Sequence, residues 1–244
     1  MAYRERVQPS AEAVARHPHL ADPQPDGWVR VDLHSHTMHS GDSTTTFDEL
    51  AEAVAAAGID VLCVTDHNAT RAGFELIERL APCRVIIGEE VKTYVGEIIG
   101  LFLTERIPGG LQPVEVCTRI REQGGIVYIP HPFDPLRNCL RAAVLDELVT
   151  AGLVDAIEGR NAKTSLEHLN EQAQRYGAEH GLAVGAGSDA HVAEAIGAAY
   201  AEVPDFDGPA SFLASLRAGR VVGHHFDAPR RWRPRIIPSV AAEY

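Results

Sequence analysis

The chain has 244 residues, 45% of them hydrophobic, a length and composition that suit one large α/β domain with an ordinary core. Its 34 acidic and 22 basic side chains give a formal net charge of −12, which disfavours nonspecific binding of long nucleic acids. There is neither a signal-peptide pattern nor an apolar stretch long enough to span a membrane, and the four widely spaced cysteines are typical of reduced thiols in a cytoplasmic protein.

In chain order, the sequence predicts three parts. Residues 1–27 hold a weak helical segment and a proline-rich link, which indicates an N-terminal appendage. The domain itself is expected over residues 28–226, and a basic tail interrupted by proline follows over residues 227–244. Within the domain, short apolar runs alternate with helical segments. Strands are expected at residues 29–33, 61–65, 84–88, 97–103, 126–130, 154–158 and 183–188, and helices at residues 46–57, 71–80, 113–123, 142–150 and 165–180.

Residues of metal-binding type follow most of these strands. Side chains two apart on a strand share a face, so His34 and His36 can point to one centre, and so can Asp189 and His191. Delivery of ligands from the ends of nearly every strand favours a parallel barrel, whose active site lies at the carboxyl ends of its strands. An open doubly wound sheet is the alternative, but it collects its ligand at one switch point.

The residue types at these strand ends indicate the kind of metal. Imidazole and carboxylate groups without thiolates suit Zn, Mn or Fe, and such mixed sets commonly hold more than one ion. Glu90 is the candidate for a bridging carboxylate, because it follows a middle strand. Two ions about 3.5–4 Å apart share a hydroxide and neutralise both the attacking and the leaving oxygen, which suits hydrolysis of a phosphate ester.

Six short motifs between residues 34 and 191 carry a family resemblance. They are His34-x-His36, Ser40-Gly41-Asp42, Thr65-Asp66-His67, Gly88-x-Glu90, His131-Pro132 and Ser188-Asp189-Ala190-His191. In this order they resemble the polymerase and histidinol phosphatase (PHP) family of metal-dependent phosphoesterases. The resemblance implies a distorted (β/α)7 barrel that binds two or three divalent ions at the carboxyl ends of its strands.

The resemblance also implies which side chains hold the ions. The first ion would lie among four of them, His34, His36, Glu90 and Asp189. Glu90 and His131 would bind the second ion. A third ion would be held by Asp42, His67 and His191. Independently of the resemblance, Asp66 is expected to accept a hydrogen bond that orients a neighbouring ligand.

Two positions depart from the family pattern. The family often reads Ser-Asp-Gly after its first motif, whereas here Asp42 comes one position later. Glu97 stands where the family often has a histidine. If Glu97 is a ligand, the second ion lies in a more anionic and harder site, which shifts the preference from Zn towards Mn or Fe.

Cationic residues beyond the strand ends are candidates for binding a phosphate group. Arg160 and Lys163 are favoured, and Arg137 is a further candidate. His39 lies in the loop of the first motif, where it is a candidate for protonating a leaving oxygen. The histidines outside the motifs, including His17, are expected to be exposed to solvent.

The sequence therefore favours a metal-dependent hydrolase, a phosphoesterase whose metal-bound hydroxide attacks a small phosphorylated metabolite or a nucleotide. A second hypothesis keeps the metal site but places a carbamate, ester or amide carbonyl in it. A third is a metal-binding scaffold without catalysis, which retention of nearly all ligand positions argues against.

Overall fold

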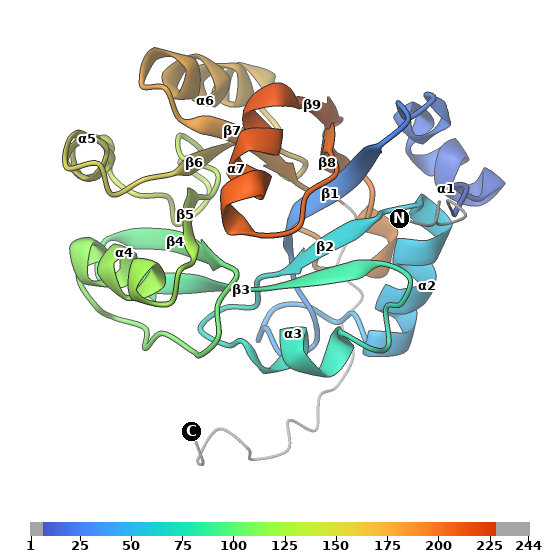
Figure 1. Cartoon of the computed structure of the whole chain (residues 1–244), viewed down its shortest axis with the longest axis horizontal. Helices are drawn as coiled ribbons and strands as arrows, with labels where there is room; N and C mark the ends of the chain where they lie inside the picture. Colours follow the sequence, from blue (N-terminus) through green and yellow to red (C-terminus); the bar gives the residue numbers. More distant parts are fainter. Residues whose placement is uncertain (1–6, 228–244) are drawn as a thin grey trace.

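The fold is built on one sheet, which the computed structural model describes together with the rest of residues 7–227 (Figure 1). Its strands have the order β7-β6-β5-β4-β3-β2-β1-β8-β9. Their bounds are β1 Trp28–Ser35, β2 Val61–Val64, β3 Arg84–Thr93, β4 Gly96–Leu101, β5 Ile126–Ile129, β6 Ala156–Asn161, β7 Ala183–Gly187, β8 Ala199–Pro204 and β9 Arg220–Gly223.

The sheet curls until its two halves meet. The amide of His36, just after β1, donates to the carbonyl of Ala190 after β7 at 3.0 Å, and the amide of Asp189 donates to the carbonyl of His34 at 2.7 Å. These two hydrogen bonds bring the ends of β1 and β7 together. The two strands are not neighbours in the sheet order, and the sheet holds seven other strands. The nearly closed sheet confirms the predicted distorted barrel and is not the open doubly wound alternative.

The strand directions show where the barrel is distorted. Strands β1, β2 and β3 are parallel, as are β5, β6 and β7. Strand β4 is antiparallel to β3, because the chain turns back at Gly96 without an intervening helix, and it is also antiparallel to β5. Strands β8 and β9, which the sequence did not predict, extend the sheet in antiparallel fashion beyond β1.

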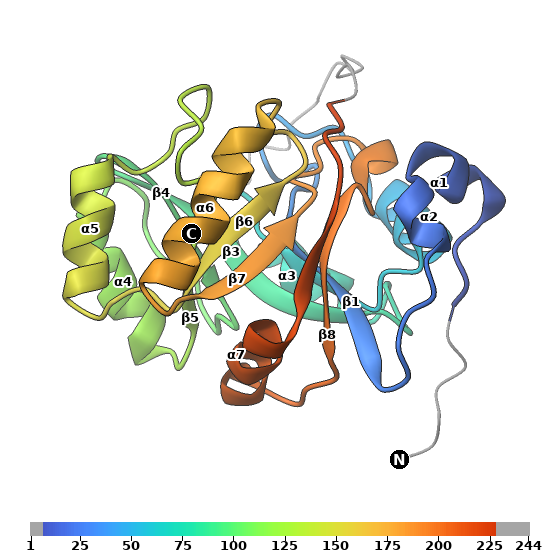
Figure 2. The ribbon, with the colours of Figure 1, turned by 90° about the horizontal axis from the view of Figure 1, so that it is seen from above.

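Helices cover the outside of the sheet (Figures 1 and 2). They are α1 Ala11–Arg16, α2 Phe47–Ala57, α3 Arg71–Leu76, α4 Pro113–Glu122, α5 Ala142–Thr150, α6 Glu167–Glu179 and α7 Pro209–Ala218. Helix α2 begins with a capping box between Thr46 and Glu49 and ends at Gly58, whose φ of 63° suits glycine. Helix α3 is shorter than the predicted segment 71–80, and α7 was not predicted.

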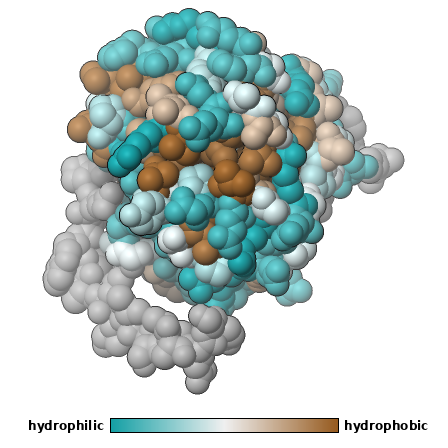
Figure 3. Space-filling view, turned by 90° about the vertical axis from the view of Figure 1, so that its left-hand side faces the viewer, coloured by the Kyte–Doolittle hydropathy of each residue, from teal (hydrophilic) through white to brown (hydrophobic). Residues whose placement is uncertain are grey.

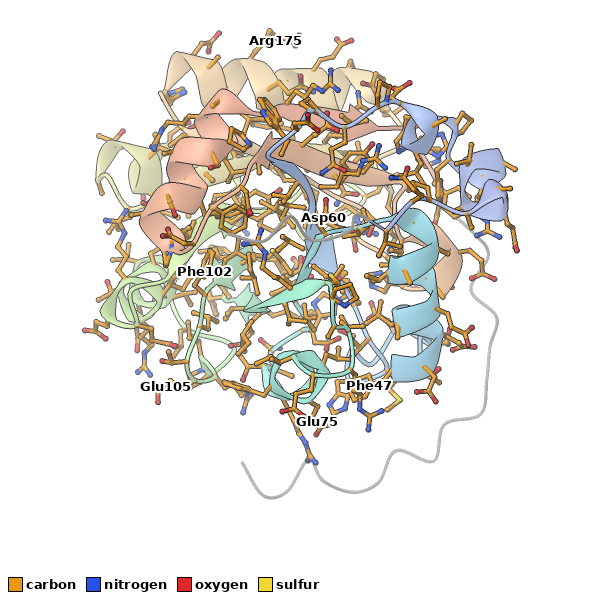
Figure 4. All side chains as sticks on the ribbon, turned by 45° about the vertical axis from the view of Figure 1, so that its right-hand side comes forward. Phe47, Asp60, Glu75, Phe102, Glu105 and Arg175 are labelled. Atoms are coloured by element: carbon orange, nitrogen blue, oxygen red, sulfur yellow. The ribbon has the colours of Figure 1, made fainter. Side chains whose placement is uncertain are left out.

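Apolar side chains fill the barrel and the space beneath the helices. The interior includes Leu33, Cys63 and Tyr128, each fully buried, while α4 and α5 pack through Val116 and Leu145 in a separate cluster. Charged side chains such as Glu75, Glu105 and Arg175 project outward (Figure 4). The face shown in Figure 3 is largely hydrophilic, with apolar residues gathered near its centre.

The described part of the predicted N-terminal appendage packs against α2. Ala13 and Leu20 are buried in the same apolar cluster as the core-facing side of that helix, and the amide of Ser10 donates to the carbonyl of Ala56 at 2.7 Å. His17 is fully buried, so the expectation of solvent exposure was wrong for this residue. The predicted basic tail lies outside the described residues except for Asp227. No helix among residues 7–227 is long and apolar enough to cross a membrane.

Candidate metal centre

The side chains predicted as metal ligands converge at the carboxyl ends of the strands. Four groups of three have ligand atoms within 4.8 Å of one another, and all are at least partly buried. The groups are His34, His36 and Glu90; His34, His131 and Asp189; His67, Glu90 and Glu97; and His36, His67 and His191. Because the groups share members, they form one continuous cluster. We use the name ligand cluster for these residues and Asp42.

The first part of the cluster lies between β1 and β7. The Nε2 atoms of His34 and His36 are 3.0 Å apart, and each lies 3.3 Å from Oε2 of Glu90. Oδ1 of Asp189 lies 3.4 Å from Nε2 of His36 and 3.8 Å from that of His34. The four side chains predicted for the first ion thus surround one point.

The second part lies across the β3–β4 hairpin. Oε1 of Glu90 lies 3.0 Å from Nε2 of His131, and Oε2 of Glu97 lies 3.8 Å from the same atom. Nδ1 of His67 is 3.1 Å from Glu90 and 3.8 Å from Glu97. Glu97 is 5% exposed and faces the cluster, because the hairpin brings the start of β4 back beside the end of β3. It therefore lies among the predicted ligands and not at the surface.

Asp42 completes the third part of the cluster. Its Oδ2 lies 3.2 Å from Nε2 of His191 and 3.6 Å from Nε2 of His67. Burial raises the pKa of the Asp42 carboxyl, but the two imidazoles outweigh this effect and hold it well below its ordinary value. The loop after β1 thus delivers its carboxylate to the cluster despite the displacement of the acid by one position.

Hydrogen bonds on the far side of each ring decide which nitrogen faces the cluster. The Ser40 hydroxyl donates to Asp66 at 2.7 Å, so it accepts at 2.9 Å from Nδ1 of His36. Nδ1 of His34 faces the Glu158 carboxylate at 3.1 Å. When both rings are neutral, the two Nε2 atoms present lone pairs to each other, and a proton or a cation between them satisfies both. This arrangement fits a divalent cation.

The electrostatics of the cluster agree with this fit. Burial lowers the pKa of His34, but the carboxylates of Glu90 and Glu158 raise it to about 10. The pKa of Glu97 is raised by its burial and by the neighbouring charge of Glu90. Buried carboxylates that lie this close together repel one another, and a bound cation relieves that repulsion.

Two carboxylates form hydrogen bonds behind the predicted ligands, and the sequence analysis predicted only one of them. Asp66 acts as predicted, since it accepts from the hydroxyls of Thr37 and Ser40, and Ser40 in turn orients His36. Glu158, at the end of the predicted strand 154–158, was missed as part of the site. Glu158 is a carboxylate at the end of a predicted strand, like the predicted ligands, and this position could have indicated it. It was missed because it belongs to none of the six motifs that resemble the family.

The candidate substrate residues separate into two groups. The Arg137 guanidinium contacts the Asp189 carboxylate, and Nζ of Lys163 lies 3.1 Å from Nδ1 of His191. Arg160, favoured over Arg137 by the sequence, instead pairs with Glu167 at the start of α6, because its side chain leaves the outer side of β6. The His39 ring stacks on Phe47 with ring centroids 5.4 Å apart, so it lies against α2.

Comparison with known proteins agrees with this geometry. The family model for the PHP domain matches residues 32–116, and the model described as PHP-associated matches residues 167–221. An uncharacterized protein of Methanocaldococcus jannaschii is 35% identical over 199 residues, which cover 78% of this chain and 79% of that protein. A probable phosphatase of Photobacterium profundum is 27% identical over 197 residues, 68% of this chain and 80% of its own length.

A solved structure has the same fold. It is a two-domain protein from Bacteroides vulgatus that contains a predicted PHP-like metal-dependent phosphoesterase, and it superposes with a TM-score of 0.68 at 16% identity. The match covers 92% of this chain and 70% of that chain. The family models, the archaeal relative and the arrangement of the ligand cluster lead to one conclusion: the chain belongs to the PHP domain family of metal-dependent phosphoesterases.

Proposed function

We propose that the protein hydrolyses the phosphate ester of a small metabolite or nucleotide with the aid of two or three divalent ions, Zn, Mn or Fe. The observation that carries this proposal is the cationic pair at the edge of the ligand cluster. Arg137 and Lys163 both approach Asp189 from loops that follow β5 and β6. A guanidinium and an ammonium beside a metal site suit a phosphate dianion.

The ligand cluster offers positions for more than one ion. His34, His36, Glu90 and Asp189 would hold the first, and Glu90, Glu97, His131 and His67 the second. Asp42, His67 and His191 would hold a third. Divalent ions in such a site polarise the phosphoryl group and neutralise the charge that develops on the attacking and leaving oxygens.

The chain's own cations would bind and orient the substrate. The side chain of Lys163 is 6% exposed and that of Arg137 is 20% exposed, so both charges lie in a partly desolvated setting. Hydrogen bonds to a charged group are stronger there than in water. Arg137 would exchange its contact with Asp189 for one with the phosphate, which also leaves Asp189 available to an ion.

Protonation of the leaving oxygen by His39 stays a prediction. The ring is half-buried against Phe47, and a rotation of the side chain would be needed to bring it to the ligand cluster. A cytoplasmic location, expected from the dispersed cysteines, also stays a prediction.

One experiment tests the function. Metal content is measured by elemental analysis on protein purified without chelator, and the same sample is assayed for phosphate release from nucleotides and sugar phosphates. We expect two or three ions per chain and phosphate release that stops with chelator and returns with Mn²⁺ or Zn²⁺.

Other outcomes would contradict the proposal in distinct ways. Full metal content with cleavage of aryl esters or carbamates but no phosphate release would point to carbonyl hydrolysis. Full metal content without any turnover would favour the scaffold hypothesis. Absence of bound metal under all loading conditions would rule out the metal centre itself.

A further inference from the structure

A buried carboxylate behind the ligand cluster contacts several of its members. Glu158 on β6 is 1% exposed and faces the barrel interior beneath the histidines. Its Oε1 lies 3.1 Å from Nδ1 of His34. Its Oε2 accepts from the amide of His131 at 2.7 Å and from Nδ2 of Asn161 at 2.9 Å. One side chain therefore contacts two predicted ligands from the side away from the ions.

The chemistry of these contacts requires a carboxylate. Three donors converge on Glu158, and an ionised carboxylate is the side chain of this size that only accepts hydrogen bonds. Burial raises the pKa of Glu158, but the His34 imidazole and the other donors outweigh burial and keep it below its ordinary value. A glutamine at this position would set its own amide N–H group against one of the three donors.

The contact with His131 also fixes an unusual backbone conformation. His131 has a φ of 30°, in the left-handed region that residues with a Cβ rarely adopt. Its amide donates to Glu158, and this hydrogen bond holds the peptide in place. The direction in which the His131 ring leaves the chain is therefore linked to Glu158.

Asn161 extends the network to a third ligand. Its Nδ2 contacts both Glu158, at 2.9 Å, and Oδ2 of Asp189, at 3.1 Å. Its Oδ1 accepts from the amide of Lys163 at 2.8 Å, and its own amide donates to Asn170 on α6 at 3.0 Å. Asn161 is thus anchored to the helix layer while it touches the cluster.

The absence of a side chain at Gly187 on β7 leaves space for this network. Asn161 pairs with Gly187 in the β6–β7 register. A Cβ atom at Gly187 would lie 2.3 Å from Cβ of His34 and 2.8 Å from Oε1 of Glu158. A larger residue there would force the imidazole and the carboxylate apart.

We infer that Glu158, assisted by Asn161, is a positioning residue that orients ligands of two neighbouring ion sites, namely His34 and Asp189 for the first and His131 for the second. It holds the proton of His34 on Nδ1 and so presents Nε2 to the ion. This inference rests on the metal binding in the proposed function but not on which bond is cleaved.

The test compares the Mn²⁺ affinity of the full chain and its variants by calorimetric titration after chelator treatment. We expect Glu158→Gln to weaken Mn²⁺ binding by about 10- to 100-fold, the usual cost of losing a partner that orients a metal-binding histidine. Asn161→Ala, which keeps the carboxylate and removes its link to Asp189, should have a smaller effect in the same direction. Long-range ¹H–¹⁵N spectra of the Zn²⁺-loaded protein, in which His34 is neutral, should show the proton of His34 on Nδ1 in the wild type and a mixture of tautomers in Glu158→Gln.

The matched control is Glu202→Gln. Glu202 is also a buried glutamate of the same sheet, 2% exposed, but it pairs with Arg30 and Arg220 away from the cluster. We expect this variant to lose stability while it keeps wild-type Mn²⁺ affinity. Wild-type affinity and an unchanged His34 tautomer in folded Glu158→Gln would overturn the inference, and so would equal losses in Glu202→Gln.

The outcomes also separate this inference from the proposed function. If Glu158→Gln does not fold, Asn161→Ala decides, because wild-type affinity and tautomers in that variant would overturn the network. Weaker Mn²⁺ binding in the variants without phosphate release from any sample would support the network and contradict the phosphoesterase reaction. Failure of the wild type to bind Mn²⁺, Zn²⁺ or Fe²⁺ would overturn both.

Discussion

Two fully buried histidines in different parts of this protein, His34 and His17, have pKa values that are shifted in opposite directions. In the ligand cluster, fully buried His34 lies between two carboxylates, and its pKa rises to about 10. In a second group, which consists of His17, His19 and His224 and which we call the terminal histidine group, fully buried His17 has its pKa lowered to about 4. Burial lowers the pKa in both places, so the neighbouring charges decide the sign.

The hydrogen-bond partners explain the difference. In the terminal histidine group, Nε2 of His17 donates to the carbonyl of Glu194 at 2.9 Å, and Nε2 of His19 donates to that of Gly197 at 2.8 Å. Nδ1 of His17 then faces Nε2 of His224 at 3.0 Å, an ordinary pair of acceptor and donor. These rings are satisfied as neutral groups, whereas the facing Nε2 atoms of His34 and His36 are satisfied only by a proton or a cation between them. Grouped histidines alone therefore do not make a metal site.

The largest expected effect follows from removing the shared carboxylate of the ligand cluster. Glu90→Ala should lower phosphate release by about 10³-fold, the upper range for losing one group that stabilises developing charge, and should reduce the metal content. The matched change in the other group, His17→Ala, should leave metal content per folded chain unchanged. Steady-state kinetics with elemental analysis measures both, and full metal in Glu90→Ala would break the comparison.

Metal removal should destabilise the protein through the ligand cluster alone. An ion that binds only the folded state at 100 times its Kd contributes about 2.7 kcal/mol to the free energy of unfolding. Urea denaturation with and without chelator should show a loss of this order in the wild type and in His17→Phe. Equal stability with and without metal would show that the ligand cluster does not bind ions under these conditions.

Replacing each of the two candidate arginines by alanine sharpens the comparison at the edge of the ligand cluster. Arg137→Ala should lower kcat/KM for a phosphate ester by about 10- to 100-fold, because a hydrogen bond to a charged group contributes about 1.5–3 kcal/mol. Arg160→Ala removes only its pair with Glu167 and should change kcat/KM little. The reverse order of effects would return Arg160 to the role favoured by the sequence.

The last expected effect is confined to acidic pH and concerns the stability contributed by the terminal histidine group. The pKa of His17 is about 4 in the folded protein against an ordinary value of 6.5, with Arg16, His19 and His224 as the nearest charged or titratable groups. Below pH 6.5 His17 binds a proton in the unfolded chain but not in the folded protein. The free energy of unfolding therefore falls as the pH is lowered from 6.5 to 4.

His17→Phe checks this expectation by urea denaturation of metal-free protein across that pH range. The variant should lose stability less steeply than the wild type as the pH falls, because the ligand cluster titrates equally in both. Parallel curves would mean that His17 takes up its proton without cost in the folded state.

Much of the ligand cluster was predictable because its signals are local. His34 and His36 are two residues apart at the end of β1, and Asp189 and His191 are two residues apart just after β7, so alternation predicts that each pair lies on one side. Strand ends in a barrel lie on one face, which brings in Glu90 and His131. All side chains predicted as ligands converge there, and binding of an ion by each of them stays a prediction.

The sequence by itself determined which residue types follow the strands and so predicted the barrel, because alternation acts over a few residues, while the resemblance of its six motifs indicated the family and the ligand positions. Only the tertiary structure decided the contacts of Glu158, which of Arg137 and Arg160 lies beside the ligand cluster, and the burial of His17. Each of these depends on contacts between distant segments, 124 residues apart for His34 and Glu158 and 207 for His17 and His224. Local spacing carries no record of such contacts, since packing of the whole chain sets which groups meet and which charges lie beside them.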